Sequence, residues 1–232
     1  MKTIRTLAPL FLAAALAACS KDASQVAQQS DTGTQSAAAA AQTNPADVPT
    51  LRGMQIGVTT IEQMKSIYPG AIKATRGEAS FGGKTLPLES GMMEMYLINI
   101  RNEVAEQSLT FDAESGVLQF QLISRTNGTV DDLVRELTGA GFSSPQDPQA
   151  RAYFNEFIQL HTGLSESNKE ELYRWFESIN QAGGGTLRHN DLFAFVVPAA
   201  MNDDDGYNLV MIFNRAYKPE FDRKWERWQK MR

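Results

Sequence analysis

Residues 108–124 read SLTFDAESGVLQFQLIS, and this stretch decides the fold. Apolar and polar residues alternate at its start, where Leu109 and Phe111 fall on one face of an extended chain. Residues 112–116 supply a turn, and residues 117–124 alternate again. The more apolar face of this second run carries Leu118, Phe120 and Leu122. The period of two predicts two antiparallel β-strands joined by a short turn.

Other parts of the chain show the same extended pattern. Residues 93–100, 192–197 and 207–214 are rich in β-branched, aromatic and other apolar residues, and residues 71–76 form a weaker candidate. The sequence from Asn202 to Gly206 is Asn-Asp-Asp-Asp-Gly, which is typical of a turn. We therefore expect a second hairpin in the last third of the chain.

The first helix is expected just before this set of strands. Thr59 is a candidate N-cap, and Glu62 follows three residues later, as in a capping box. The apolar residues that share one helical face are Ile61, Met64, Ile67 and Tyr68. Pro69 and Gly70 end the helix.

A second helix repeats this pattern further along the chain. Thr129 and Asp132 form its capping box, and residues 139–141 end it. Its apolar stripe consists of Val130, Leu133, Val134 and Leu137. At an offset of 69 residues, Thr60-Ile61-Glu62 matches Thr129-Val130-Asp131. This match suggests two tandem helix-plus-sheet units, residues 51–127 and 128–232.

Helical stripes also occur within residues 150–182, and a last helix begins at Pro219, a residue favoured in the first helical turn. Together, these patterns predict one α+β domain over residues 51–232. In this domain, an antiparallel β-meander is packed by helices on one face.

Composition excludes several classes of protein. The chain has 232 residues, is 42% hydrophobic and has a net charge of −5, which is atypical of collagen-like or fully disordered proteins. The acidic balance also argues against nucleic acid as a partner. One cysteine, Cys19, leaves no internal disulfide and no cysteine-based zinc site.

The first 19 residues have the pattern of a secretory signal peptide. Lys2 and Arg5 precede an apolar run over residues 7–15, which is too short to span a bilayer as a helix because about 20 residues are needed. The run ends in Leu16-Ala17-Ala18-Cys19, which resembles the lipobox of bacterial lipoproteins. The alternative is an ordinary signal peptide with a chance cysteine.

The lipobox resemblance implies that Cys19 is lipidated, becomes the new N-terminus and carries several fatty acyl chains such as palmitate. Several chains anchor stably because each buried CH₂ contributes about 0.8 kcal/mol. A serine directly after the cysteine, here Ser20, resembles the pattern of enterobacterial lipoproteins that are sorted to the outer membrane. We therefore expect a lipid-anchored protein of the cell envelope, on the periplasmic face of the outer membrane.

Residues 20–50 have the composition of a disordered tether. They are rich in Ser, Ala, Gln and Thr, and Val26 and Val48 are their only large apolar residues. A flexible coil of this length reaches on the order of 30 Å. Without residues 1–19, the chain has 20 basic and 27 acidic side chains and a net charge of −7. Acyl chains, and not charge, are therefore expected to hold it at the membrane.

Candidate cofactor and metal motifs are incomplete, so we expect no cofactor. Gly83-Lys84-Thr85 lacks the first glycine of a phosphate-binding loop and the helix that must follow. In the acidic turn before Gly206, Met201 stands where a calcium loop needs its first ligand. His161 and His189 lack metal-binding spacing, although His189-Asn190-Asp191 leaves open an imidazole oriented by a carboxylate.

The C-terminal helix is the expected contact surface for a partner. It combines aromatic and basic residues, and the candidates for partner contact are Arg223, Trp225, Arg227 and Trp228. Such a helix also has the composition of one that touches a membrane. The alternative is that its aromatic side chains pack on the sheet while its charges face water.

Residues 53–70, with the pattern Gly-Met-x-Ile-Gly-x-Thr followed by a helix and strands, resemble SmpA/OmlA-type lipoproteins and β-lactamase-inhibitor-protein-like domains. This chain differs from the SmpA/OmlA pattern in its additional helices. The resemblance implies a non-enzymatic role in which the domain binds another envelope protein as a scaffold or inhibitor.

Two alternatives stay open. One is an envelope or cell-wall hydrolase that uses paired carboxylates, with Glu89, Glu94, Glu103 and Glu106 as candidates. The other is a carrier of a hydrophobic ligand between helices and sheet.

Overall fold

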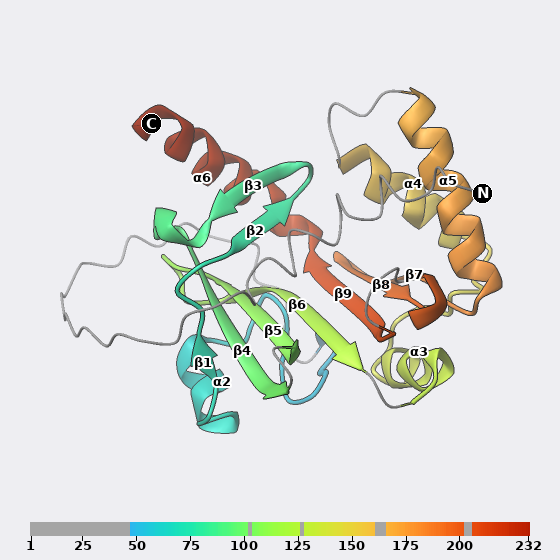
Figure 1. Cartoon of the computed structure of the whole chain (residues 1–232), viewed down its shortest axis with the longest axis horizontal. Helices are drawn as coiled ribbons and strands as arrows, with labels where there is room; N and C mark the ends of the chain where they lie inside the picture. The colour runs from blue at the N-terminus through green and yellow to red at the C-terminus, as the bar shows by residue number, and fades with distance from the viewer. Residues whose placement is uncertain (1–46, 102–103, 126–127, 161–165, 202–205) are drawn as a thin grey trace.

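The computed structural model describes residues 47–101, 104–125, 128–160, 166–201 and 206–232 (Figure 1). The expected signal peptide, Cys19 and most of the expected tether lie outside these ranges. None of the helices in the described ranges is long and apolar enough to cross a bilayer.

One seven-stranded antiparallel sheet forms the centre of the fold, with the strand order β1-β4-β5-β6-β9-β8-β7. Its strands are β1 (Ile72–Lys73), β4 (Met93–Arg101), β5 (Val104–Asp112), β6 (Leu118–Arg125), β7 (Gly185–His189), β8 (Leu192–Val197) and β9 (Asn208–Asn214). Strands β5 and β6 are the two strands predicted from residues 108–124. The α+β class and the antiparallel meander packed by helices are confirmed.

Each half of the chain contains a helix followed by three consecutive strands of this sheet, and the first half also contributes the short strand β1. Helix α2 (Ile61–Ile67) precedes β4, β5 and β6, and helix α3 (Val130–Gly139) precedes β7, β8 and β9. The last strands of the two halves, β6 and β9, pair with each other, from Phe120 opposite Phe213 to Arg125 opposite Asn208. That the two halves are tandem copies of one helix-plus-sheet unit stays a prediction.

Both helices begin with a capping box, as predicted, but the first box lies one residue later. Thr129 and Asp132 cap α3 in the predicted positions. Helix α2 is capped by Thr60 and Gln63, so the predicted pair of Thr59 and Glu62 is wrong. Thr59 is buried, and its hydroxyl accepts a hydrogen bond from the Gln55 backbone N–H at 2.8 Å.

The first face of the sheet is covered by α2, α3 and residues 47–58, a segment that we call the strap. Met64 of α2 and Leu133 of α3 are at most 1% exposed and lie in one core cluster with residues of the central strands. The strap contributes Val48, Leu51, Met54 and Ile56 to this cluster. The packed chain thus already includes residue 48, which we had placed in the tether of residues 20–50.

Polar contacts fix the strap at its start and at its tip. His189 Nε2 lies 2.8 Å from the carbonyl oxygen of Asp47, and Nδ1 lies 2.9 Å from that of Gly141. Arg52 and Gly53 have φ values of 50° and 77° and form a tight two-residue turn. The guanidinium of Arg52 donates to Glu136 of α3 and to Glu106 of β5, each at 3.1 Å.

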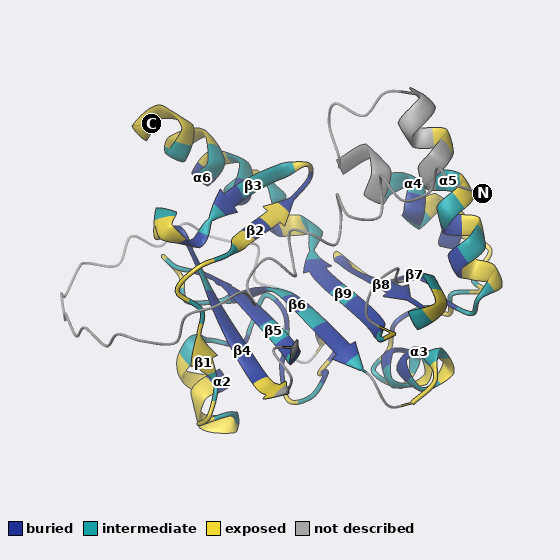
Figure 2. Ribbon diagram, in the orientation of Figure 1, coloured by how far each residue is buried: buried dark blue, intermediate teal, exposed yellow. Residues whose placement is uncertain are grey.

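The second face carries further helices and a separate hairpin (Figure 1). The helices are α4 (Ala150–Leu160), α5 (Glu166–Gln181) and α6 (Lys218–Met231), and the hairpin strands are β2 (Glu78–Phe81) and β3 (Lys84–Pro87). Short 3₁₀ helices are η4 (Leu88–Ser90), η5 (Ala199–Met201) and η6 (Arg215–Tyr217). Because elements cover both faces, all six residues of β8 are buried (Figure 2). Helices were predicted on one face of the sheet, and the structure has helices on both faces.

A register shift in β6 changes which side chains share a face. The pairing of β5 with β6 shifts between Thr110 and Phe111. Leu118 therefore packs with Ile123 in the core of the first face, whereas Phe120 packs on the second face. The prediction that Leu118 and Phe120 share one apolar face is wrong.

Candidate functional site

Helix α6 packs by one side against the second face of the sheet. It follows η6, and Pro219 lies in its first turn, where the missing N–H costs nothing. Phe221 is fully buried and contacts the rings of Phe81, Phe120 and Tyr217 edge-on. This aromatic cluster holds the first half of α6 on the sheet.

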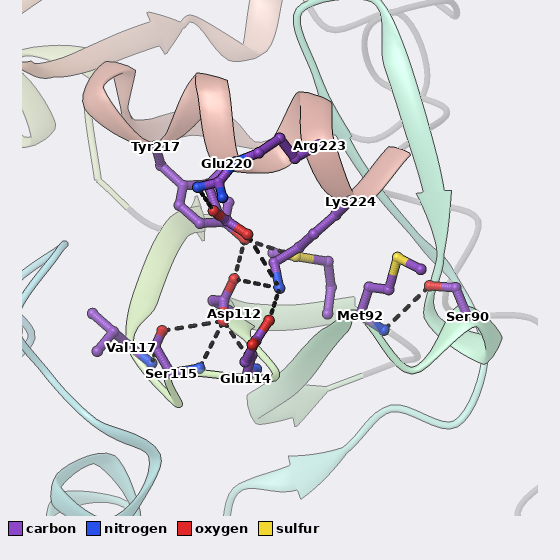
Figure 3. Close-up of polar contacts among 11 residues, drawn as sticks. Ser90, Met92, Asp112, Glu114, Ser115, Val117, Tyr217, Glu220, Arg223 and Lys224 are labelled. Carbon is purple, nitrogen blue, oxygen red and sulfur yellow. Dashed lines mark hydrogen bonds and ion pairs between the residues drawn. The ribbon is translucent and has the colours of Figure 1, made fainter. Parts of the chain in front are cut away.

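A buried ionic cluster fixes α6 next to these rings (Figure 3). Lys224 of α6 has a side chain that is only 3% exposed, and its Nζ lies 3.2 Å from Asp112 Oδ2 at the end of β5. Nζ also lies 3.2 Å from Glu114 and 3.6 Å from Glu220. The hydroxyl of Tyr217 donates a short hydrogen bond to the same Asp112 oxygen.

The turn after β5 supplies the remaining hydrogen bonds to the Asp112 carboxylate. Its Oδ1 accepts hydrogen bonds from the backbone N–H of Glu114 at 2.9 Å and of Ser115 at 2.7 Å, and from the Ser115 hydroxyl at 3.1 Å. The two carboxylate oxygens are therefore used separately. One oxygen orders the turn, and the other binds α6.

The titration of this cluster follows from its burial and its partners. Burial acts to raise the pKa of Asp112, but the hydrogen bonds from Tyr217 and Ser115 and the charge of Lys224 outweigh it, so this pKa lies below its ordinary value. Burial and the neighbouring Asp112 carboxylate raise the pKa of Tyr217 above its ordinary range. At neutral pH, Asp112 is thus a carboxylate and Tyr217 a neutral donor.

We expect the cluster to fix the orientation of α6 more than it stabilises the fold. Desolvation of buried charges offsets much of their attraction, and the best-attested role of such groups is to fix one arrangement. Lys224 finds its carboxylate partners in only one rotation of α6. The opposite side of the helix is therefore presented to solvent in a defined way.

The solvent side of α6 carries three exposed cations, which we call the basic stripe: Arg223, Arg227 and Lys230. Their spacing of four and three residues places them on one side of an α-helix. Arg223 forms an ion pair with Glu220, one turn earlier. Within the described ranges, Arg227 and Lys230 have no ion-pair partner.

The structure divides the predicted contact residues into two groups. Arg223 and Arg227 are exposed, as a contact surface requires. Trp225 and Trp228 are half-buried and pack by part of their rings against the core of the second face, and their contact with a partner stays a prediction. Lys84 of β3 lies over Trp225 and Arg232 over Trp228, each 4.9 Å from the ring centre.

The predicted carboxylate pair is not formed by the strand residues. Glu94 of β4 lies opposite Phe111, and Glu106 lies five residues before Phe111 on β5. At 3.4 Å per residue, the two side chains are about 17 Å apart along the sheet, beyond the roughly 5–9.5 Å of glycosidase pairs. Glu94 instead pairs with Lys73, and Glu106 with Arg52. Glu89 is exposed in η4, and Glu103 lies outside the described residues.

Other sequence candidates are accounted for by structure. His189 contacts backbone carbonyl oxygens and not Asp191, which pairs with Arg215, so an imidazole oriented by that carboxylate is not formed. Lys84 and Thr85 lie in the strand β3. His161 and the acidic residues before Gly206 lie outside the described residues. In the portion that the structure describes, no three His, Cys, Asp or Glu side chains gather as metal ligands would.

The anchoring residues Asp112, Tyr217 and Lys224 were not predicted as site residues. One signal was present in the sequence, because Lys224 lies on the same helical face as Phe221, Trp225 and Trp228. A lysine within an apolar stripe indicates a buried partner of opposite charge. The sequence did not show which carboxylate that partner is.

The chain was compared with known proteins. No protein-family model, no curated protein and no solved structure matches it. The resemblance to SmpA/OmlA-type lipoproteins therefore stays a prediction from residues 53–70.

Proposed function

We propose that the protein is a lipid-anchored lipoprotein of the bacterial cell envelope that binds another envelope protein through α6, in a non-enzymatic scaffold or assembly role. The observation that carries the binding role is the basic stripe, which a buried ionic cluster holds facing solvent. The lipobox-like sequence that ends at Cys19 supports the anchor.

The position of α6 is compatible with this arrangement. The described chain begins with the strap on the first face of the sheet, and α6 lies over the second face. A tether that enters at residue 47 therefore leaves the basic stripe on the side of the sheet away from the point of attachment. A partner is able to reach α6 without displacing the strap.

The anchor is tested by mass spectrometry of the native product, with Cys19→Ala as the control. We expect a chain that starts at Cys19 with added acyl mass and floats with the outer membrane on a density gradient. A Cys19→Ala chain is expected to lose the acyl mass and leave the membrane fraction. A native chain with a free thiol would refute the anchor.

The binding role is tested by photo-cross-linking in the bacterium that encodes the chain. A photoreactive residue replaces Arg227 of α6 or, as a control, Arg174, which is exposed on α5. We expect a protease-sensitive adduct from position 227 and none from position 174. Absence of any adduct from position 227 would contradict protein binding through α6.

A further inference from the structure

We infer that the basic stripe is a docking surface for an acidic segment of a partner protein. The inference rests on the proposed function, because it gives the chemistry of the partner that α6 binds. The stripe runs along α6 from Arg223 to Lys230, which spans about 10 Å at 1.5 Å per residue. Two or three carboxylates on one side of a partner helix or strand fit this length.

The charge distribution of the chain singles out this helix. Residues 218–232 have six basic and three acidic side chains, a net charge of +3. The rest of the chain after residue 19 has 14 basic and 24 acidic side chains, a net charge of −10. A positive patch on an otherwise negative protein steers an acidic partner to that patch and repels it elsewhere.

The charges of the stripe are available for a partner. The side chain of Arg223 is 67% exposed, and within the described ranges its ion-pair partner is Glu220 on its own helix. Among the residues that the structure describes, nothing acidic pairs with Arg227 or Lys230. By contrast, other arginines on this side of the sheet, such as Arg188 and Arg215, are both bound to Glu156 of α4.

The orientation of the aromatic residues favours a protein over a lipid surface. A helix that lies in a membrane interface exposes its apolar face. In α6, Phe221, Trp225 and Trp228 face the protein core, and Met231 is the one large apolar side chain of α6 that is well exposed.

The test measures binding of a fluorescent decaglutamate peptide to the full lipidated chain in neutral detergent, by anisotropy, with decaglutamine as the neutral probe. The variant R223Q/R227Q/K230Q removes the stripe. The control R135Q/R151Q/R174Q removes three exposed cations from α3, α4 and α5, and so changes the net charge equally. We expect about tenfold weaker binding for the stripe variant, from three exposed charge contacts, and less than twofold for the control.

Three results would overturn the inference: equal losses in both variants, no binding of decaglutamate at low salt, or binding of phosphatidylglycerol vesicles through the stripe without binding of decaglutamate. In cells, a protein adduct at position 227 that persists in the doubly substituted R223Q/K230Q background would also overturn it, while leaving the proposed function intact. Absence of the adduct from the chain that carries the photoreactive residue at position 227 but keeps Arg223 and Lys230 would instead count against the proposed function.

Discussion

Replacement of the buried lysine, Lys224→Met, tests how α6 is held. The substitution keeps a side chain of similar length but removes the cation that lies 3.2 Å from Asp112. Removal of one partner of a buried ion pair costs about 3–5 kcal/mol, because the other charge is left uncompensated. In this variant, Asp112 keeps its hydrogen bonds from the Tyr217 hydroxyl and from its own turn. We therefore expect the free energy of unfolding to fall by an amount near the lower end of this range, about 3 kcal/mol.

A double-mutant cycle separates the ion pair from packing. Asp112→Asn alone is expected to cost about 2–3 kcal/mol, because Lys224 keeps Glu114 and Glu220 nearby. In the double variant, a neutral amide faces an apolar side chain. We therefore expect a total loss about 2 kcal/mol smaller than the sum of the single losses.

The assay is urea unfolding at neutral pH, followed by tryptophan fluorescence, since Trp225 and Trp228 lie on α6. The control is Lys230→Met on the exposed side of the same helix, which is expected to change stability by less than about 0.5 kcal/mol. If Lys224→Met also costs less than about 1 kcal/mol, or if the two cluster substitutions are additive, the cluster does not hold α6 and the reasoning fails.

The pH dependence gives an independent check of the same cluster. The pKa of Asp112 is lowered in the folded protein, so its stabilising contribution is present above its unfolded value, about 4, and is lost as pH falls through the folded value. Because Lys224 contributes to this lowering, Lys224→Met is expected to lose less stability on acidification than the wild type. An identical acid dependence in both proteins would contradict the assignment.

Three further predictions concern single side chains. The pKa of Tyr217 is raised on folding, so its contribution to the free energy of unfolding is full below its unfolded value, about 10, and is lost as pH rises through the folded value. Stability measured at alkaline pH should therefore fall less steeply in Tyr217→Phe than in the wild type. An added Cβ at Gly184 would lie 2.4 Å from the Val196 carbonyl oxygen, so Gly184→Ala should lower stability by about 1–3 kcal/mol, whereas Gly139→Ala, with open space around it, should not. Thr129→Ala removes the capping hydroxyl of α3 and should cost about 1 kcal/mol in thermal or urea unfolding.

Local patterns predicted much of the fold because they depend on near neighbours in the chain. The capping box of α3 and the turn at residues 112–116 need only a few residues in sequence, and both occur as predicted. The cap of α2 was wrong because two adjacent threonines, Thr59 and Thr60, satisfy the same local rule. Tertiary contacts decide between them, since Thr59 is buried and its carbonyl oxygen accepts a hydrogen bond from the Leu118 backbone N–H of β6.

Features that depend on residues far apart in the sequence could not be predicted from local patterns. The register shift beside Phe111 depends on the partner strand, and the partners of Lys224 lie up to 112 residues away in sequence. Strand β7 was not predicted, because its residues Gly185–His189 carry little alternation. The basic residues of α6 follow from the sequence. The sequence left open whether Trp225 and Trp228 pack on the sheet or face a partner, and the fold shows that they pack against the second face.

The strap has a mechanical consequence. A pulling force on the N-terminal end of the folded body enters at residue 47, in the strap, whose first contact is with the side chain of His189 at the end of the edge strand β7. Besides the Leu51–Met54 bridge, the strap holds hydrogen bonds from Gln55 Nε2 to the Val48 carbonyl oxygen and from the Gly57 N–H to the Leu118 carbonyl oxygen of β6. These contacts are spread along the strap, so we expect them to break one after another, starting from residue 47. Tension from the proposed lipid anchor would therefore peel the strap from the first face before it reaches the hydrogen bonds that join the seven strands. The helix that carries the basic stripe, on the other face, would stay docked under that load.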